Sequence, residues 1–367
     1  MKRGSVLLLF VICLLIFACE KKTTIKIGYM GPLTGRLSDL GISGRNGAQL
    51  AIDHANQQLK EQKIELQLIA KDDRQDVEAC LEVGQELVDE GVKAVIGPMT
   101  SDMSLAVLPL FEENGVTIIS PTASTPKLTG LDDRFLRVNP PDRTEALSLA
   151  KYAAEELNLS HIVVFYDISN KSFSEGLYKT FDAALQQMGE IQVSAAPYLS
   201  DESVNFSELV AENLQKETDG VFLIASSLDS AQISQQVRKG FPDIAILATG
   251  WAMTDDFIQH GGKYVERAIF SHYHNNNSKA PAYLAFVKDY EEHFGNRPDF
   301  IAALSYNAAR VIVEALEKNR NMDKIKETIL QIGTFPALQG ELKLDNAGDA
   351  YLERHYISIA NGEYVDL

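Results

Sequence analysis

Residues 93–108 read KAVIGPMTSDMSLAVL, and this stretch decides the fold. It opens with an apolar run of strand character, KAVIG, which ends at a Gly-Pro pair. Helix-compatible sequence begins around three small hydroxyl residues, Thr100, Ser101 and Ser104. A buried strand that leads directly into a helix is the repeating unit of a parallel sheet with helices on both faces.

The same alternation continues in both directions along the chain. A first unit has expected strands at 24–31, 64–73, 93–97 and 116–120, with helices between them. Pro140-Pro141 interrupts the pattern, and a second alternating unit follows at 161–274. Two long helical runs at 282–295 and 301–319 have no strand between them, so we expect them to return to the first unit. The 367 residues are enough for two domains, and the sequence predicts an α/β fold of two doubly wound, Rossmann-like units.

The N-terminus has the pattern of an export signal. Basic residues precede an apolar stretch at 6–17 that is too short to span a bilayer comfortably, and the stretch ends in Ala18-Cys19. This end resembles the lipobox of bacterial lipoproteins, in which the cysteine is acylated. We therefore expect a signal peptide at 1–18, a lipid on Cys19 and a tether at 19–24. The protein would be a membrane-anchored lipoprotein of the periplasm or cell surface. A plain secretory signal or a membrane anchor is the alternative.

Composition limits the partners of the protein. The net charge of −17 argues against nucleic acid and against anionic membrane surfaces. Cys80 would be the only cysteine left once the signal is removed and Cys19 is acylated, so we expect no internal disulfide. The helical pattern around Cys80 predicts a buried, unreactive thiol.

The motifs of common enzyme classes do not occur in the sequence. The glycine-rich stretch at 41–47, GISGRNG, is neither a dinucleotide-binding fingerprint nor a phosphate-binding loop, and there is no nucleophile elbow. We expect it to form a loop close to a ligand, ahead of a helix. His272 and His274 fall on one face of an expected strand, but no further ligand completes a metal site, so we expect surface histidines. The sequence predicts a binding protein without catalytic residues, cofactor or metal.

The order of the elements and several motifs resemble the branched-chain amino-acid (Leu/Ile/Val) binding family, a group of type I periplasmic binding proteins that serve ABC transporters. The resemblance runs from about Thr24 to the C-terminus. It rests on IKIGYMGPLTGRLSDLGISGRNGAQLAID, DDRQDVEACLEVGQELVDEGVKAVIGPMTS, ISPTASTPKLT and FLRVNPPD. These motifs are specific to the family when taken together, although no single one is.

The resemblance implies two lobes with a ligand cleft between them. The expected first lobe comprises 25–139 plus 275–335, the second comprises 140–274 plus 336–367, and the chain crosses near Asn139, Asn275 and Phe335. It also implies that the lobes close on a small-molecule ligand and deliver it to an ABC permease in the inner membrane.

The hydroxyl residues that follow the strands have a physical role in such a fold. Ligands bind beyond the carboxyl ends of parallel strands, where helix N-termini leave N–H groups unpaired and carry partial positive charge. A carboxylate fits that field without a counter-charge. Ser101 lies at one such end, and Thr122 and Ser124 follow the next strand. In the family, the matching residues hold the carboxylate and ammonium of the ligand. Ordinary helix capping is the alternative.

Other positions that face the ligand in the family carry different residues here. Leu40 stands where the family often has an aromatic residue, and Phe173 stands at a tyrosine position. Ser227 lies in a loop that often bears a tyrosine, and Tyr306 matches a helix tyrosine that can face the cleft. Trp251 aligns with the acidic residue that meets the ligand ammonium in leucine-binding members.

The change at Trp251 leaves two alternatives for the ligand. A buried ammonium without an anion is costly, so Asp229, Asp255 or Asp256 would have to meet it. Otherwise the ligand has no ammonium and is an aromatic or branched carboxylic acid that stacks on Trp251 and Phe173. The expected function is capture of a small carboxylate-bearing ligand for an ABC importer, with a hydrophobic or branched-chain amino acid as the first choice. A sensory receptor of the same fold, without transport, is a further alternative.

Overall fold

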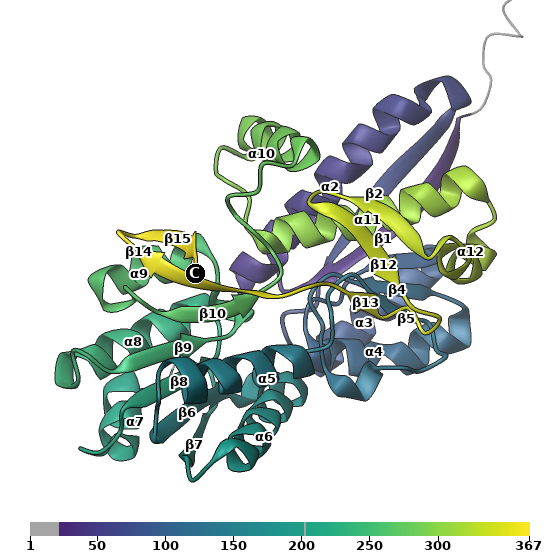
Figure 1. Cartoon of the computed structure of the whole chain (residues 1–367). Coiled ribbons are helices and arrows are strands. Elements are labelled where there is room, and N and C mark those ends of the chain that lie inside the picture. Colours follow the sequence, from purple (N-terminus) through teal and green to yellow (C-terminus); the bar gives the residue numbers. More distant parts are fainter. Residues whose placement is uncertain (1–21, 202) are drawn as a thin grey trace, which may run out of the picture.

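The computed structural model describes residues 22–201 and 203–367, which form two lobes built on separate sheets (Figure 1). The expected signal peptide and Cys19 lie outside the described residues. The alternating strands and helices agree with the α/β fold predicted from the sequence. No helix in the described ranges is long and apolar enough to span a bilayer.

The first lobe is built on five parallel strands in the order β2-β1-β3-β4-β5. The strands are β1 (Thr23–Gly31), β2 (Ile64–Asp72), β3 (Ala94–Ile96), β4 (Thr117–Ser120) and β5 (Phe135–Arg137). The helices are α2 (Ser38–Leu59), α3 (Val77–Asp89), α4 (Ser101–Asn114), α10 (Pro281–Phe294), α11 (Phe300–Lys318) and α12 (Ile325–Ile332). Because α11 packs along α2, the long helices that follow the second unit return to the first sheet.

Buried residues of this sheet alternate between two cores, as expected for parallel strands covered on both faces. Ile119 packs into the core that contains residues of α2 and α11, whereas its neighbour Ile118 packs into the core that contains residues of α3 and α4. Cys80 of α3 belongs to the second of these cores. The thiol is fully buried, so the predicted burial of Cys80 is confirmed, and burial raises its pKa, which disfavours the reactive thiolate.

The glycine-rich stretch at 41–47 lies inside α2, so the expectation of a loop is wrong. A β-carbon on Gly41 would lie 1.9 Å from the carbonyl oxygen of Pro32. A β-carbon on Gly47 would lie 2.0 Å from the carbonyl oxygen of Ala302 in α11. Gly41 and Gly47 therefore lie where other backbone segments approach the helix closely, whereas Gly44 between them faces side chains.

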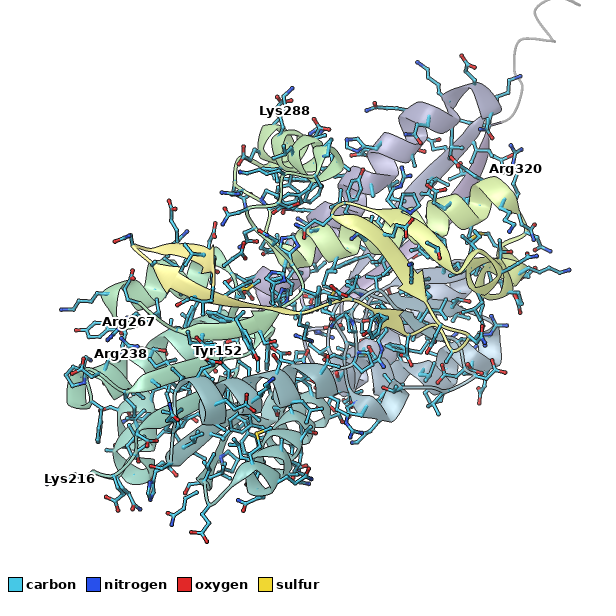
Figure 2. All side chains as sticks on the ribbon, in the orientation of Figure 1. Tyr152, Lys216, Arg238, Arg267, Lys288 and Arg320 are labelled. Carbon is cyan, nitrogen blue, oxygen red and sulfur yellow. The ribbon has the colours of Figure 1, made fainter. Side chains whose placement is uncertain are left out.

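The second lobe is built on seven strands in the order β15-β14-β10-β9-β8-β6-β7. The parallel strands are β6 (His161–Asp167), β7 (Gln192–Tyr198), β8 (Gly220–Ile224), β9 (Ala245–Ala248) and β10 (Ile269–His272), and the antiparallel strands are β14 (His355–Ala360) and β15 (Glu363–Asp366). The helices are α5 (Arg143–Lys151), α6 (Lys171–Met188), α7 (Phe206–Asn213), α8 (Ser227–Gly240) and α9 (Asp255–Gly261). Long charged side chains point outward from both lobes, among them Lys216 and Arg267 on the second and Lys288 and Arg320 on the first (Figure 2).

The C-terminal part of the chain forms a third sheet before it joins the sheet of the second lobe. The strands β11 (Thr334–Ala337), β12 (Gly340–Leu344) and β13 (Ala350–Tyr351) form a third, antiparallel sheet. This segment is tied to the first sheet, because Arg137 Nε of β5 donates to Asp349 Oδ1 at 2.6 Å. The following strand, β14, joins the second sheet. We therefore propose that 336–351 belongs to the first lobe and that the third crossing lies at 352–354 rather than near Phe335.

Candidate ligand-binding cleft

A cavity of about 540 Å³, partly open to solvent, lies between the two lobes at the carboxyl ends of their parallel strands. The first lobe contributes Leu40, Met99, Thr100, Ser101, Thr122, Ser124, Asn139 and Phe300. The second lobe contributes Glu145, Asn170, Phe173, Gly250, Trp251, His272, Tyr273 and Arg354. The structure therefore brings together most of the residues predicted from the sequence, namely Leu40, Ser101, Thr122, Ser124, Phe173 and Trp251.

Ser101 is the first residue of α4, so it combines a hydroxyl with the N-terminus of a helix. Its Oγ accepts the backbone N–H of Thr125 at 3.3 Å. The other two hydroxyls of this junction donate to protein atoms: Thr100 Oγ1 to Gln75 Oε1 at 3.0 Å, and Ser104 Oγ to Thr100 O at 2.9 Å. Among the hydrogen bonds of the described residues, Ser101 is the one of these three that donates its hydroxyl to no protein atom.

The loop after β4 brings two more hydroxyl residues to the same wall of the cavity. Thr122 Oγ1 donates to Met99 O, so this hydroxyl can only accept a hydrogen bond from a ligand. The carbonyl of Ser124 accepts the backbone N–H of Asp142 at 3.0 Å, which ties the loop to the first crossing. No hydrogen bond within the described ranges uses the Ser124 hydroxyl. Ser101 and Ser124 are therefore the hydroxyl donors of this wall.

The second lobe contributes an aromatic wall. Phe173 in the first turn of α6 and Trp251 in the turn after β9 meet edge to face, with ring centroids 5.8 Å apart and planes at 79°. Deeper in the same lobe, Tyr273 stacks on His272 at 4.3 Å, and Phe300 of the first lobe meets His272 edge-on at 4.8 Å. These rings can cover an apolar or aromatic ligand body.

The expectation that His272 and His274 are surface residues is wrong. They are 2 % and 4 % exposed, because β10 lies inside the second sheet between β9 and β14. Burial lowers the pKa of His274 to about 3 and holds the pKa of His272 well below its usual value. Burial therefore favours the neutral form of the His272 imidazole, which lines the cavity and whose Nδ1 accepts the backbone N–H of His274 at 3.0 Å. In the part of the chain that the structure describes, no group of three or more His, Cys, Asp or Glu residues could hold a metal ion.

The cavity contains two charged residues that were not predicted from the sequence, Glu145 and Arg354. Glu145 lies in the first turn of α5, where its Oε1 accepts the backbone N–H of Gly250 at 2.7 Å. Arg354 Nη2 lies 3.8 Å from Glu145 Oε2. Arg354 also donates to Ser271 O at 2.8 Å and to Thr144 Oγ1 at 2.9 Å. These contacts fix both charged groups on the second lobe.

Both charged side chains are almost fully buried, at 7 % exposed for Glu145 and 8 % for Arg354. Burial raises the pKa of Glu145, and the charge of Arg354 opposes this rise. A usable signal for Glu145 exists in the sequence, because it follows the family-like motif FLRVNPPD by three residues. No comparable signal marks Arg354 in the tail.

Two of the predicted site residues lie outside the cavity. Ser227 Oγ donates to Asp39 Oδ2 at 2.8 Å, in a contact between the lobes. The hydroxyl of Tyr306 lies 2.9 Å from His54 Nδ1 and borders a separate hollow between α2 and α10. Tyr306 therefore lies on the side of α11 that packs toward these helices, away from the cleft.

None of the three aspartates that could have met a ligand ammonium lines the cavity. Asp229 forms an ion pair with Arg36. Asp255 borders a different, polar hollow, and Asp256 follows it in the first turn of α9. The acidic residue that the cavity does contain is Glu145.

This arrangement has counterparts among known proteins. Residues 24–355 match the sequence profile of the family described as periplasmic binding protein. The chain belongs to this family. The match confirms the resemblance found in the sequence and the prediction of a binding protein rather than an enzyme.

Two curated relatives are binding proteins for branched-chain amino acids. The Leu/Ile/Val-binding protein BraC3 of Rhizobium johnstonii is 28% identical over 239 residues, which span 64% of this chain and 62% of that protein, less than two thirds of its length. A leucine-, isoleucine-, valine-, threonine- and alanine-binding protein of Pseudomonas aeruginosa is 24% identical over 336 residues, which span 89% of this chain and 87% of that protein.

Solved structures have the same fold. The leucine-binding protein LivK of Thermotoga maritima gives a TM-score of 0.83 at 27% identity, and the match covers 94% of this chain and 97% of that chain. A solute-binding protein of an ABC transporter from R. palustris, solved with benzoate, gives a TM-score of 0.82 and covers 94% of this chain and 95% of that chain. At 18% identity, the second likeness shows the fold alone.

Proposed function

We propose that the protein is the solute-binding component of an ABC importer and captures a small carboxylate-bearing ligand between its two lobes. The observation that carries this proposal is the cavity itself. It joins the N-terminus of α4 and the hydroxyls of Ser101 and Ser124 on one lobe to the rings of Phe173 and Trp251 on the other. A polar anchor that faces an apolar wall suits a ligand with a charged head and a hydrophobic body.

The ligand carboxylate binds at the first lobe in this proposal. The N-terminus of α4 supplies partial positive charge, and Ser101 and Ser124 supply hydroxyl donors. Hydrogen bonds from such donors to a carboxylate are stronger than bonds between neutral groups. A carboxylate can therefore bind here without a cationic side chain.

The ligand that we favour is a hydrophobic α-amino acid of the branched-chain type. Its ammonium binds to Glu145, which replaces the acid that the family has at the position of Trp251. Glu145 Oε2 accepts no hydrogen bond from the described residues, and its separation of 3.8 Å from Arg354 leaves it able to accept one from an ammonium. The apolar side chain of the ligand then packs against Leu40, Phe173 and Trp251.

An aromatic or branched carboxylic acid without an amino group is the second candidate. Arg354 balances the charge of Glu145 without any help from a ligand ammonium, and this observation favours such an acid. The benzoate-bound protein of R. palustris shares the fold. In this case the carboxylate binds to the same hydroxyls, and the body of the ligand packs on Phe173 and Trp251.

The N-terminal sequence supports a location for this activity. We propose that residues 1–18 are removed and that Cys19 is acylated. The lipid then anchors the protein to a membrane, in the periplasm or at the cell surface. A lipid anchor keeps the binding protein close to its permease in the inner membrane.

A thermal-shift panel of matched ligands tests the proposed function. L-leucine carries both charged groups, 4-methylpentanoate lacks the amino group, and isoamylamine lacks the carboxylate. A ligand at about 100 times its Kd raises the free energy of unfolding by about 2.7 kcal/mol. If the ligand is an amino acid, we expect L-leucine to stabilise the protein. If the second candidate holds, we expect 4-methylpentanoate and benzoate to stabilise it. Isoamylamine should not stabilise the protein in either case. The proposal fails if no carboxylate stabilises the protein, or if isoamylamine does so equally well.

A further inference from the structure

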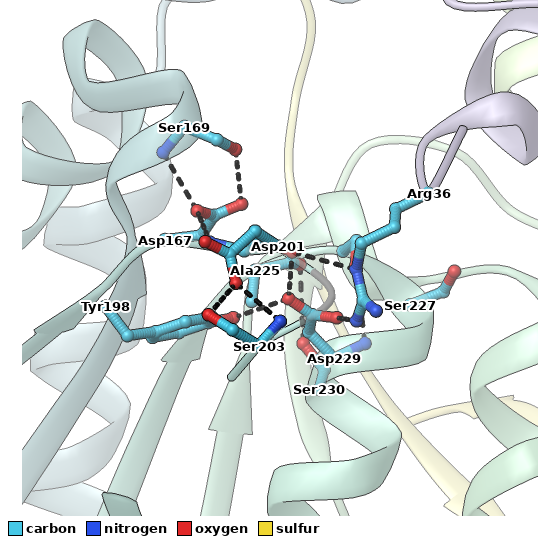
Figure 3. Close-up of polar contacts among 12 residues, drawn as sticks. Arg36, Asp167, Ser169, Tyr198, Asp201, Ser203, Ala225, Ser227, Asp229 and Ser230 are labelled. Carbon is cyan, nitrogen blue, oxygen red and sulfur yellow. Dashed lines mark hydrogen bonds and ion pairs between the residues drawn. The ribbon is translucent and has the colours of Figure 1, made fainter. Parts of the chain in front are cut away.

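The two lobes also meet outside the cavity, where the loop before α2 contacts the first turn of α8 (Figure 3). Arg36 in this loop forms an ion pair with Asp229 of α8, and Arg36 Nε donates to Ser200 Oγ at 3.2 Å. Beside this pair, Ser227 Oγ donates to Asp39 Oδ2 at 2.8 Å. None of these five residues lines the cavity.

The second lobe holds the carboxylate of Asp229 in place without help from the first lobe. Asp229 is 0 % exposed, and its Oδ2 accepts hydrogen bonds from the hydroxyls of Tyr198 at 3.0 Å and Ser200 at 2.6 Å. Figure 3 shows the carboxylate between Tyr198 on its own lobe and Arg36 on the other. Because Tyr198 and Ser200 belong to the same lobe as Asp229, they fix this carboxylate whether the lobes are open or closed.

An ion pair with this geometry differs from an ordinary surface pair. Exposed pairs contribute little, since both charges remain hydrated. Asp229, by contrast, is fully buried in the arrangement in which it meets Arg36, and a buried carboxylate without a counter-charge is costly. The counter-charge lies on the other lobe, so only closure brings Arg36 to Asp229. The pair therefore stabilises the closed arrangement relative to the open one.

We propose that Arg36 is a positioning residue for ligand capture, which latches the two lobes over the ligand by pairing with Asp229 and does not touch the ligand. This inference rests on the proposed function, because it takes the cavity as the binding site. The observed affinity of a binding protein scales with the fraction of molecules that can reach the binding-competent state. Loss of the latch therefore lowers the affinity for every ligand of the cavity by the same factor, whatever charged groups the ligand carries.

Arg36→Gln tests the latch, with Arg310→Gln as a matched control. Arg310 pairs with Glu314 inside α11, and its side chain is 23% exposed, against 29% for Arg36. Isothermal titration with L-leucine and with 4-methylpentanoate gives a Kd for each probe that binds. We expect Arg36→Gln to raise Kd about ten- to hundredfold, by the same factor for both probes. The control should change Kd by less than about twofold.

The conservative variant Arg36→Lys separates charge from geometry. Lysine keeps the charge but loses the second donor that reaches Ser200, so its Kd should fall between those of the wild type and Arg36→Gln. A wild-type Kd for Arg36→Gln overturns the latch. A loss confined to one of two bound probes also overturns it, because that result would mean direct contact with the ligand.

A second measurement keeps failure of the latch distinct from failure of the proposed function. If the wild type binds neither probe, the proposed function fails, and hydrogen exchange in the ligand-free protein then tests the latch. In this proposal the lobes also close part of the time without ligand, so the amides of 33–39 and 226–231 should exchange faster in Arg36→Gln than in the wild type and in Arg310→Gln. Equal exchange in the wild type and Arg36→Gln overturns the inference.

Discussion

Replacement of Glu145 by glutamine should separate amino acids from simple carboxylic acids as ligands. Glutamine has nearly the same size, and its oxygen can still accept the backbone N–H of Gly250, which lies 2.7 Å from Glu145 Oε1. The substitution therefore leaves the shape of the cavity intact. It removes a negative charge from a side chain that is only 7 % exposed.

The size of the effect follows from this buried position. A hydrogen bond between charged groups contributes about 1.5–3 kcal/mol, or roughly ten- to hundredfold in Kd. The gross Coulomb attraction at a separation of about 4 Å and an effective dielectric constant of about 20 is roughly 4 kcal/mol, and desolvation of the ammonium and the nearby Arg354 offset part of it. We expect L-leucine to bind Glu145→Gln about ten- to hundredfold more weakly, and 4-methylpentanoate to bind it equally well or better.

Isothermal titration calorimetry with both ligands near neutral pH measures this difference. A pH series adds an internal check, because burial raises the pKa of Glu145. As the pH falls through that raised pKa, Glu145 is protonated, so the wild type loses affinity for L-leucine while Glu145→Gln does not. An unchanged Kd for L-leucine, or equal losses for the two ligands, would refute the assignment of the ammonium to Glu145.

Three further changes have definite outcomes. Burial raises the pKa of Asp299 from 3.8 to about 6. Ionised Asp299 therefore destabilises the folded protein above about pH 6, and this destabilisation disappears as the pH falls below the pKa of Asp299 in the unfolded chain. In urea titrations, Asp299→Asn should therefore raise the free energy of unfolding by up to roughly 3 kcal/mol near neutral pH and much less at acid pH; an equal gain at both would contradict this cause. Cys19→Ser should move the protein from membrane to soluble fractions, and unchanged fractionation would count against acylation. Binding of L-leucine should change the fluorescence of Trp251, the single tryptophan, because closure removes water from its ring; constant emission at calorimetric saturation would place Trp251 outside the site.

The sequence was sufficient to predict the residues that follow local rules. The stretch at 93–108 predicts a buried strand and a helix, and in a doubly wound sheet the junction between them must lie at the ligand-binding edge. Ser101 and Ser124 lie in the cavity for this reason, since each follows the carboxyl end of a parallel strand. Phe173 and Trp251 follow strands of the second lobe in the same way.

The residues that escaped prediction depend on pairings that are distant along the chain. Arg354 reaches Glu145 because β14 pairs antiparallel with β10, with His355 opposite His272, and no local pattern specifies that register. Tyr306 of α11 faces α2 and α10, because its hydroxyl lies 2.9 Å from His54 Nδ1 and its ring meets Phe286 at 5.0 Å. The glycines at 41 and 47 allow Pro32 and Ala302 to approach α2 closely, but the sequence alone does not show that these two residues lie there.

The claim that Ser101 holds a ligand carboxylate at the N-terminus of α4 is the centre of this account. A calorimetric cycle tests it with the wild type and Ser101→Ala, each titrated with L-leucine and with L-leucinamide, in which an amide replaces the carboxylate. The N-cap position belongs to Thr100 and is unchanged, although the substitution removes the Ser101 oxygen that accepts the backbone N–H of Thr125. We predict that Ser101→Ala raises the Kd for L-leucine about ten- to hundredfold. The Kd for L-leucinamide, which is already a poor ligand, should rise by less than about threefold. Equal affinities of the wild type and Ser101→Ala for L-leucine would contradict the account and leave Ser101 with a structural role alone.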